Sequence, residues 1–86
     1  MNILFEQSSS KGAFFIVENN QRLAEMTFSK AGDKLIIIDQ LRGKGAGKQL
    51  VAAAVAYARE KNLKILPLCP FAKSVFNKVT EFQDVL

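Results

Sequence analysis

The sequence predicts an α+β domain in which a four-stranded antiparallel meander precedes a long helix, a fifth strand and a short C-terminal helix. Three observations support this fold class. The chain has 86 residues, enough for a single domain spanning residues 1–86. Its first half contains short apolar runs separated by turn-forming residues. Its second half contains one long stretch in which apolar residues recur at helical spacing.

Four runs in the first half have the composition of β-strands, with aliphatic and aromatic residues that fit a pleated surface. They cover residues 2–5, 13–17, 23–28 and 35–38. The third run alternates, so Glu25 shares a face with Leu23 and Thr27. The fourth is aliphatic throughout, as expected of a strand covered on both faces. Because short segments rich in turn formers connect the runs, we expect an antiparallel meander.

The second half begins with a predicted helix over residues 47–61, rich in Ala, Leu, Lys, Gln and Glu. Its apolar stripe consists of Leu50, Val51, Ala54, Val55, Tyr57 and Ala58. Asn62 is a plausible helix stop, and residues 63–68 form the fifth predicted strand. Pro70 can begin the last helix, which we expect to reach about Val79, because a missing N–H costs nothing in a first turn.

The composition excludes several classes of function. The chain has no histidine and one cysteine, Cys69. We therefore expect no internal disulfide and no metal site, and the catalytic pairs that need histidine are excluded. We expect a cytoplasmic protein with no membrane contact, because there is no secretory signal and no apolar run long enough to span a bilayer. The net charge of +4 favours an anionic partner without choosing among nucleic acid, a phosphorylated cofactor and an acidic protein.

The most specific local signal is the segment LRGKGAGK, which follows a predicted strand and opens the long helix. Its three glycines occupy alternate positions and leave the backbone uncovered by side chains. The N–H groups of a first helical turn have no internal partners, and the helix dipole adds positive charge there. These features together predict a site for phosphate oxygens. Full positive charges around it come from Arg42, Lys44 and Lys48.

Two known phosphate motifs do not fit this segment. A P-loop ends in Gly-Lys followed by Ser or Thr, whereas Gln49 follows Lys48 here. A dinucleotide fingerprint needs a third glycine three positions beyond Gly45, where Lys48 stands, and a parallel strand-helix-strand unit. A glycine-rich turn that merely caps the helix is the alternative without a ligand.

The pattern Gln/Arg-x-x-Gly-x-Gly/Ala after a strand fits better, since Arg42, Gly45 and Gly47 match it. It is the pyrophosphate loop of the GNAT superfamily of N-acetyltransferases. The chain resembles very small members of that superfamily over about half its length, through this loop and the later block PLCPFAK at residues 67–73. The resemblance implies a truncated GNAT (acyl-CoA N-acyltransferase) fold, with no room for the two helices that normally follow the first strand.

The resemblance also implies that acetyl-CoA (acetyl-coenzyme A) is the cofactor. Its pyrophosphate would meet the backbone of residues 42–48, and its pantetheine arm would pair with residues 37–39, where the fourth and fifth strands splay apart. The last helix would flank the thioester. The implied contact residues are Ile37, Ile38, Asp39, Leu41, Arg42, Gly43, Lys44, Gly45, Ala46, Gly47, Lys48, Cys69, Phe76 and Asn77.

Three residues are candidates for the transfer chemistry. Glu25 and Asp39 are carboxylates that could accept a proton from the attacking amine, although Glu25 could equally face solvent and Asp39 could bind the loop backbone. Cys69 precedes the last helix, a position that favours thiolate and nucleophilic catalysis. The alternative is a buried, purely structural cysteine.

The sequence therefore favours an N-acetyltransferase whose acceptor is an amine of unknown identity, such as a polyamine, a peptide lysine or a protein N-terminus. A non-catalytic acyl-CoA binder or sensor is the second hypothesis, because the elements that commonly build the acceptor pocket are missing. A basic nucleic-acid-binding protein is the third hypothesis, motivated by the net charge of +4. It ranks last because the aromatic residues do not interleave with basic ones, as a stacking surface for bases would require. We expect a monomer or a weak dimer.

Overall fold

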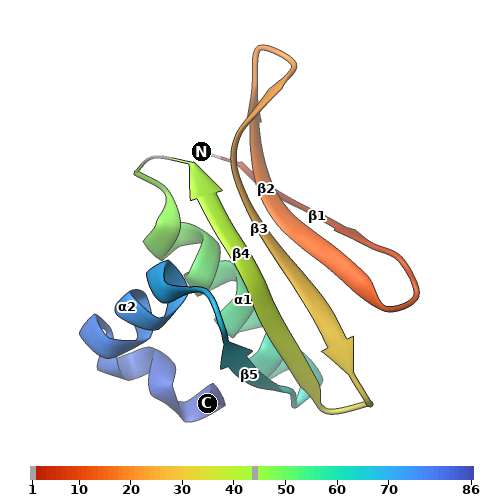
Figure 1. Ribbon diagram of the computed structural model, residues 1–86, viewed down its shortest axis with the longest axis vertical. Coiled ribbons are helices and arrows are strands. Elements are labelled where there is room, and N and C mark those ends of the chain that lie inside the picture. Colours follow the sequence, from red (N-terminus) through yellow and green to blue (C-terminus); the bar gives the residue numbers. More distant parts are fainter. Residues whose placement is uncertain (1, 44) are drawn as a thin grey trace.

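The computed structural model describes residues 2–43 and 45–86, and Figure 1 shows a twisted sheet with helices gathered on one side. The strands are β1 (Ile3–Gln7), β2 (Lys11–Glu18), β3 (Gln21–Ala31), β4 (Leu35–Gly43) and β5 (Lys64–Pro67). The helices are α1 (Gly47–Lys61), α2 (Pro70–Lys78) and the 3-10 helix η1 (Thr80–Val85).

The sheet confirms the predicted fold class. Its strands lie in sequence order, β1-β2-β3-β4-β5, and the first three pairings are antiparallel. β5 pairs with β4 in parallel, because α1 forms the crossover between them. The positive φ angles of Asn19 and Asn20 close the hairpin between β2 and β3, as the turn-forming preference of asparagine predicts.

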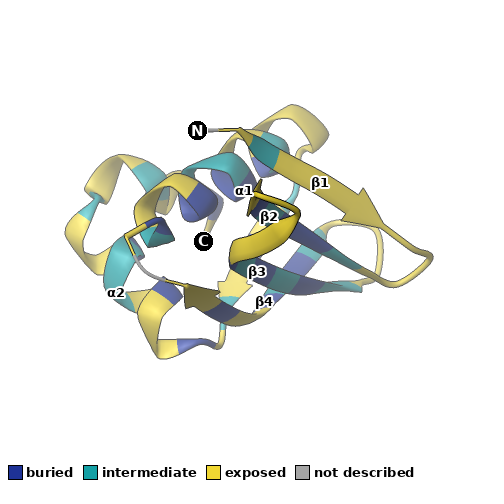
Figure 2. Ribbon diagram, turned by 90° about the horizontal axis from the view of Figure 1, so that it is seen from above, coloured by how far each residue is buried: buried dark blue, intermediate teal, exposed yellow. Residues whose placement is uncertain are grey.

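The core lies between the sheet and α1. Alternation along β3 buries Ala24, Met26 and Phe28, and these side chains pack with the apolar stripe of α1. Figure 2 shows the buried positions of the strands and of α1 facing each other. The remaining β3 residues, Glu25, Thr27 and Ser29, lie on the opposite side of the sheet, which we call the open face.

The helices begin and end close to their predicted limits. α1 ends at Lys61, and its C-cap Asn62 adopts the left-handed conformation with a φ of 58°. α2 begins at Pro70, as expected from the missing N–H of proline. η1 was not predicted from the sequence. It is held to α1 by two hydrogen bonds from Arg59 to Asp84, of 3.0 and 2.7 Å.

β4 differs from its prediction in two ways. It continues to Gly43, so Arg42 and Gly43 pair with β3 and do not belong to the loop or to the first turn of α1. It also contains a β-bulge: Phe28 pairs with Ile38 and Thr27 with Gln40, which leaves Asp39 as an extra residue. The expectation that this strand is covered on both faces is wrong, because Ile37 on the open face is only half-buried.

Two further findings concern the described residues only. None of their helices is long and apolar enough to cross a membrane. They also contain no group of three or more cysteine or acidic side chains that could hold a metal ion.

Candidate functional site

β4 and β5 separate halfway along β4. Their pairing begins at Leu35 and Lys64 and ends at Ile38 and Pro67, where the N–H of Leu68 donates to the Ile38 carbonyl over 3.0 Å. Beyond this point β4 continues to Gly43 with β3 on one side and, among the described residues, no strand on the other. The Asp39 bulge lies directly at the separation, so an extended ligand could pair with exposed β4 backbone there.

The glycine loop connects this part of β4, which pairs with β3 but not with β5, to α1. Gly43 and Gly45 adopt φ angles of 106° and 76°, which disfavour any other residue. Ala46 is the N-cap, and its carbonyl accepts a hydrogen bond of 3.0 Å from Leu50 N–H. Among the residues that the structure describes, no side chain caps the first turn of α1, and no acidic residue lies in that turn. Its N–H groups are therefore available to an anion. Lys44, also predicted to contact the cofactor, lies outside the described residues.

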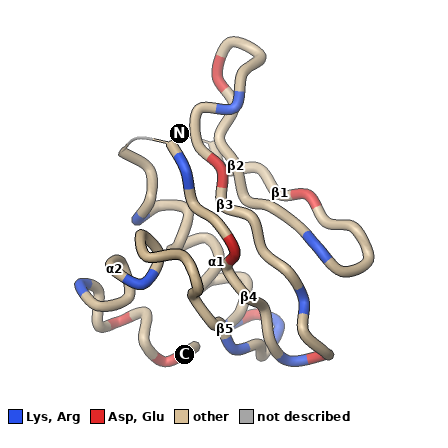
Figure 3. Tube along the Cα trace, viewed as in Figure 1, with Lys and Arg blue, Asp and Glu red and all other residues tan. Residues whose placement is uncertain are grey.

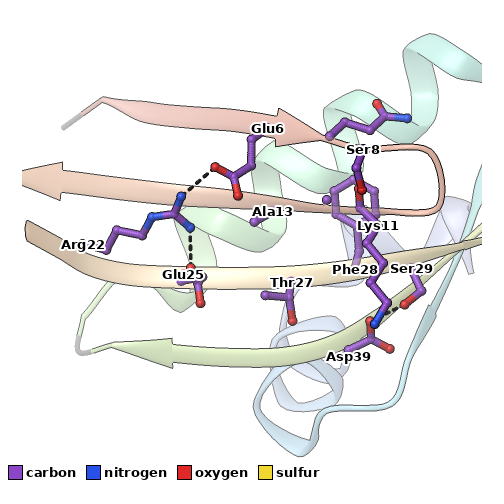
Figure 4. A pocket seen from close by; sticks show the side chains of 12 residues that line it. Glu6, Ser8, Lys11, Ala13, Arg22, Glu25, Thr27, Phe28, Ser29 and Asp39 are labelled. Atoms are coloured by element: carbon purple, nitrogen blue, oxygen red, sulfur yellow. Dashed lines mark hydrogen bonds and ion pairs between the residues drawn. The ribbon is translucent and has the colours of Figure 1, made fainter.

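A hollow of about 600 Å³ occupies the open face of the sheet. Figure 4 shows side chains from neighbouring strands around it, including Lys11 of β2, Glu25 and Ser29 of β3 and Asp39 of β4. The structure thus brings the two predicted catalytic carboxylates to one cavity. The cavity lies on the side of the sheet opposite α1 and the core.

A chain of ion pairs crosses one end of this hollow. The two terminal nitrogens of Arg22 bind Glu6 and Glu25, and Arg42 binds the second oxygen of Glu25 over 2.7 Å. These charges come from β1, β3 and β4, and Figure 3 shows acidic and basic positions along these strands. Hydrogen bonds from Arg42 and then Arg22 hold the pKa of the Glu25 carboxyl below its usual value. Glu25 is therefore a stable anion and a weak proton acceptor while both arginines are bound.

Asp39 has a different environment. The hydroxyl of Ser29 donates a hydrogen bond of 2.6 Å to its Oδ2, and none of the described lysines or arginines forms an ion pair with it. The carboxylate lies in the bulge, beside the end of the β4–β5 pairing. Asp39 therefore combines a free charge with a position close to the separated strands.

Comparisons with known proteins agree with this geometry. The model of the GCN5-related N-acetyl-transferase family matches residues 13–85. The chain belongs to this family. It is also similar to a GCN5-like candidate N-acetyltransferase from Staphylococcus aureus whose structure was determined by NMR in solution. The two chains are 38% identical with a TM-score of 0.73, over 98% of this chain and 87% of the other. Among curated proteins there is no significant match.

In this member of the GCN5-related N-acetyltransferase family, three residues predicted to contact the cofactor, Cys69, Phe76 and Asn77, lie at the start of α2 or within it. Cys69 is the N-cap of α2 and is 6% exposed within the apolar core. Phe76 is fully enclosed and contacts the ring of Phe82, so it packs the core and offers no surface to a ligand in this conformation. Asn77 is exposed. Of the three, only Asn77 is open to solvent.

Several residues that line the hollow or its ion pairs were not identified from the sequence. Glu6 lies on β1, whereas Arg22 and Ser29 lie on β3, and only the strand register brings Glu6 within reach of Arg22. The alternation of β3 was the available signal, because it places Ser29 on the face of Glu25. The bulge had no sequence signal, since Asp39 and Gln40 both resemble ordinary loop residues.

Proposed function

We propose that this chain transfers the acetyl group of acetyl-CoA to an amine. The family supports acyl transfer to an amine. The assignment of acetyl-CoA as cofactor is supported by three features that follow one another along the chain. They are the separation of β4 from β5, the bulge at Asp39, and the uncapped glycine loop before α1. An extended, anionic molecule fits that combination, with an arm along β4 and phosphates at the helix.

The fit of each part follows from the backbone. The first-turn N–H groups of α1 would bind the pyrophosphate, helped by the charge of Lys48. The backbone of Ile37, Ile38 and Asp39 would hold the pantetheine arm at the edge left by β5. Leu41 and Ala46 have buried side chains, so they could contribute only backbone groups.

When bound, acetyl-CoA supplies the acetyl group as a thioester: the acceptor nitrogen forms the new C–N bond, the C–S bond breaks, and the thiol leaves. The acceptor ammonium must first lose a proton to become a nucleophile. Asp39 is the carboxylate that we assign to this proton, directly or through water, because no arginine neutralises it and it lies beside the separated strands.

The open face is the surface that we assign to the acceptor. It is broad and exposed, which fits an amine on a flexible molecule such as a polyamine or a peptide lysine better than a small enclosed substrate. The same openness supports the second candidate function, a non-catalytic acyl-CoA binder, because no enclosed acceptor pocket is present among the described residues.

NMR titration of the ¹⁵N-labelled protein with acetyl-CoA tests the cofactor site. We expect the largest amide shifts at residues 37–39 and 45–48, with little change in the hairpin between β2 and β3. Unchanged spectra at millimolar acetyl-CoA would contradict the proposal. Release of free thiol with a panel of amines then separates the two functions: tight binding without any release supports the acyl-CoA binder.

Cys69 gives a separate prediction for the route of transfer. Because its side chain is 6% exposed in an apolar core, we expect direct attack by the amine and no acetyl-cysteine intermediate. Cys69→Ala should keep the rate of thiol release within about threefold of wild type, as for a residue outside the reacting atoms. Mass spectrometry of the wild-type protein with acetyl-CoA is the direct check. A +42 Da adduct, about the mass of one acetyl group in place of a hydrogen, located on Cys69 would contradict it.

A further inference from the structure

We propose that the Glu25–Arg42 ion pair is a latch: the anionic cofactor competes with Glu25 for Arg42, and the released carboxylate then attracts the cationic acceptor. The inference rests on the proposed function, because it requires coenzyme A at the glycine loop. It goes beyond that function in linking the cofactor site to the acceptor face through two residues.

The contacts make Arg42 the mobile member of the ion-pair chain. Its side chain is 69% exposed, and its single hydrogen bond among the described residues is to Glu25 Oε2. Arg22, in contrast, binds Glu6 and Glu25 together, and its guanidinium lies 3.8 Å above the ring of Phe15. Three contacts hold Arg22 and one holds Arg42. A competing anion would therefore remove Arg42 and leave Arg22 in place.

The position of Arg42 places it between the two sites. It directly precedes Gly43, the last residue of β4, and the loop after it opens α1. Its guanidinium nevertheless binds Glu25, its register partner on β3, on the open face. A pyrophosphate at the loop carries more negative charge than one carboxylate and offers several acceptor oxygens, so it competes effectively for a guanidinium.

Release of Arg42 changes Glu25. The carboxylate, 13% exposed, has one oxygen on each arginine, and the Arg42 bond is the larger cause of its lowered pKa. Without Arg42, one oxygen is free toward the open face and the pKa rises toward its usual value. A bound cofactor thus prepares a site for an ammonium group, and by linkage a bound amine strengthens cofactor binding.

Calorimetric titration with coenzyme A tests the latch with matched variants. Glu25→Gln removes the competitor of the cofactor, so we expect coenzyme A to bind about fivefold more tightly than to wild type. Glu6→Gln removes the same charge from the same chain of ion pairs without touching Arg42, so its affinity should remain near wild type. Equal tightening in both variants would mean a general charge effect and would overturn the latch, as would weaker binding to Glu25→Gln.

Two further measurements test the latch even if one of the variants folds poorly. Arg42→Gln should lose affinity, and adding Glu25→Gln to it should restore nothing, because the latch needs both residues. In the wild-type protein, the NMR titration of the Glu25 carboxyl carbon should show a pKa that rises when coenzyme A is added. An unchanged pKa would overturn the latch. If wild-type protein fails to bind coenzyme A, the proposed function and the latch both fall; if it binds and Glu25 is unaffected, only the latch falls.

Discussion

Replacing Gly45 with alanine should abolish most coenzyme A binding while leaving the protein folded. Gly45 has a φ of 76°, and apart from its chain neighbours a Cβ atom there would meet no atom of the described residues within 4 Å. The cost to folding is therefore the strain of one left-handed alanine, about 1 kcal/mol. The added methyl group would stand over the backbone N–H groups that we assign to the pyrophosphate. We expect the affinity for coenzyme A to fall at least about tenfold, measured by calorimetry.

Gly47→Ala is the matched control for Gly45→Ala. Gly47 begins α1, and a Cβ there would lie 3.5 Å from Leu41 Cδ2, an ordinary contact. The pyrophosphate-loop pattern also accepts alanine at this position. We expect its affinity to stay within about threefold of wild type, because a helical alanine leaves the N–H directions unchanged. Equal losses in the two variants would argue against the assigned approach of the phosphates.

Gly43→Ala should cost more stability than alanine at Gly32, Gly45 or Gly47. Its φ is 106°, and a Cβ would lie 2.5 Å from both the Ala24 Cα and the Leu23 carbonyl oxygen. Backbone atoms cannot move aside as a flexible side chain can, so β3 and β4 would have to separate. Strain and overpacking together should cost about 3 kcal/mol. That is a large part of the total for a small domain, and urea unfolding measures it.

Gly32→Ala isolates the steric contribution at Gly43. Gly32 also has a positive φ, of 71°, but beyond its chain neighbours a Cβ there would meet nothing within 4 Å in the part of the chain that the structure describes. Its variant should lose only about 1 kcal/mol, the cost of the left-handed conformation alone. Similar losses in the two variants would show that backbone conformation, and not the close approach of β3 and β4, makes Gly43 necessary.

Most of the fold could be predicted from local patterns. The alternation of β3 and the stripe of α1 correctly identified the faces that form the core, because burial imposes these periods on the sequence. Pro70 and Asn62 marked helix limits through their own backbone preferences. The end of β4 could not be predicted in this way. Arg42 and Gly43 resemble loop residues, and only pairing with β3 makes them a strand.

The candidate site could be predicted only in part. The glycine loop is contiguous in sequence, so its chemistry was visible there. The environments of Glu25 and Asp39 depend on which strands become neighbours: Glu25 lies between two arginines and Asp39 beside a serine hydroxyl. Phe76 shows that a residue type alone does not identify a contact. It was expected beside the cofactor, and in the structure its ring is buried in the core. Side-chain partners across a sheet follow from the strand register, and the register cannot be read from local patterns in a single sequence.

The bulge at Asp39 has a consequence for the direction of every later side chain in β4. In a regular strand, Ile38 and Arg42 would point to the same face, because their separation is an even number of residues. The extra residue reverses the phase, so that Leu41 joins Ile38 in the core and Arg42 faces Glu25. One inserted position thus lets a single strand supply apolar side chains to the core throughout, and still deliver a guanidinium to the opposite surface just before the loop.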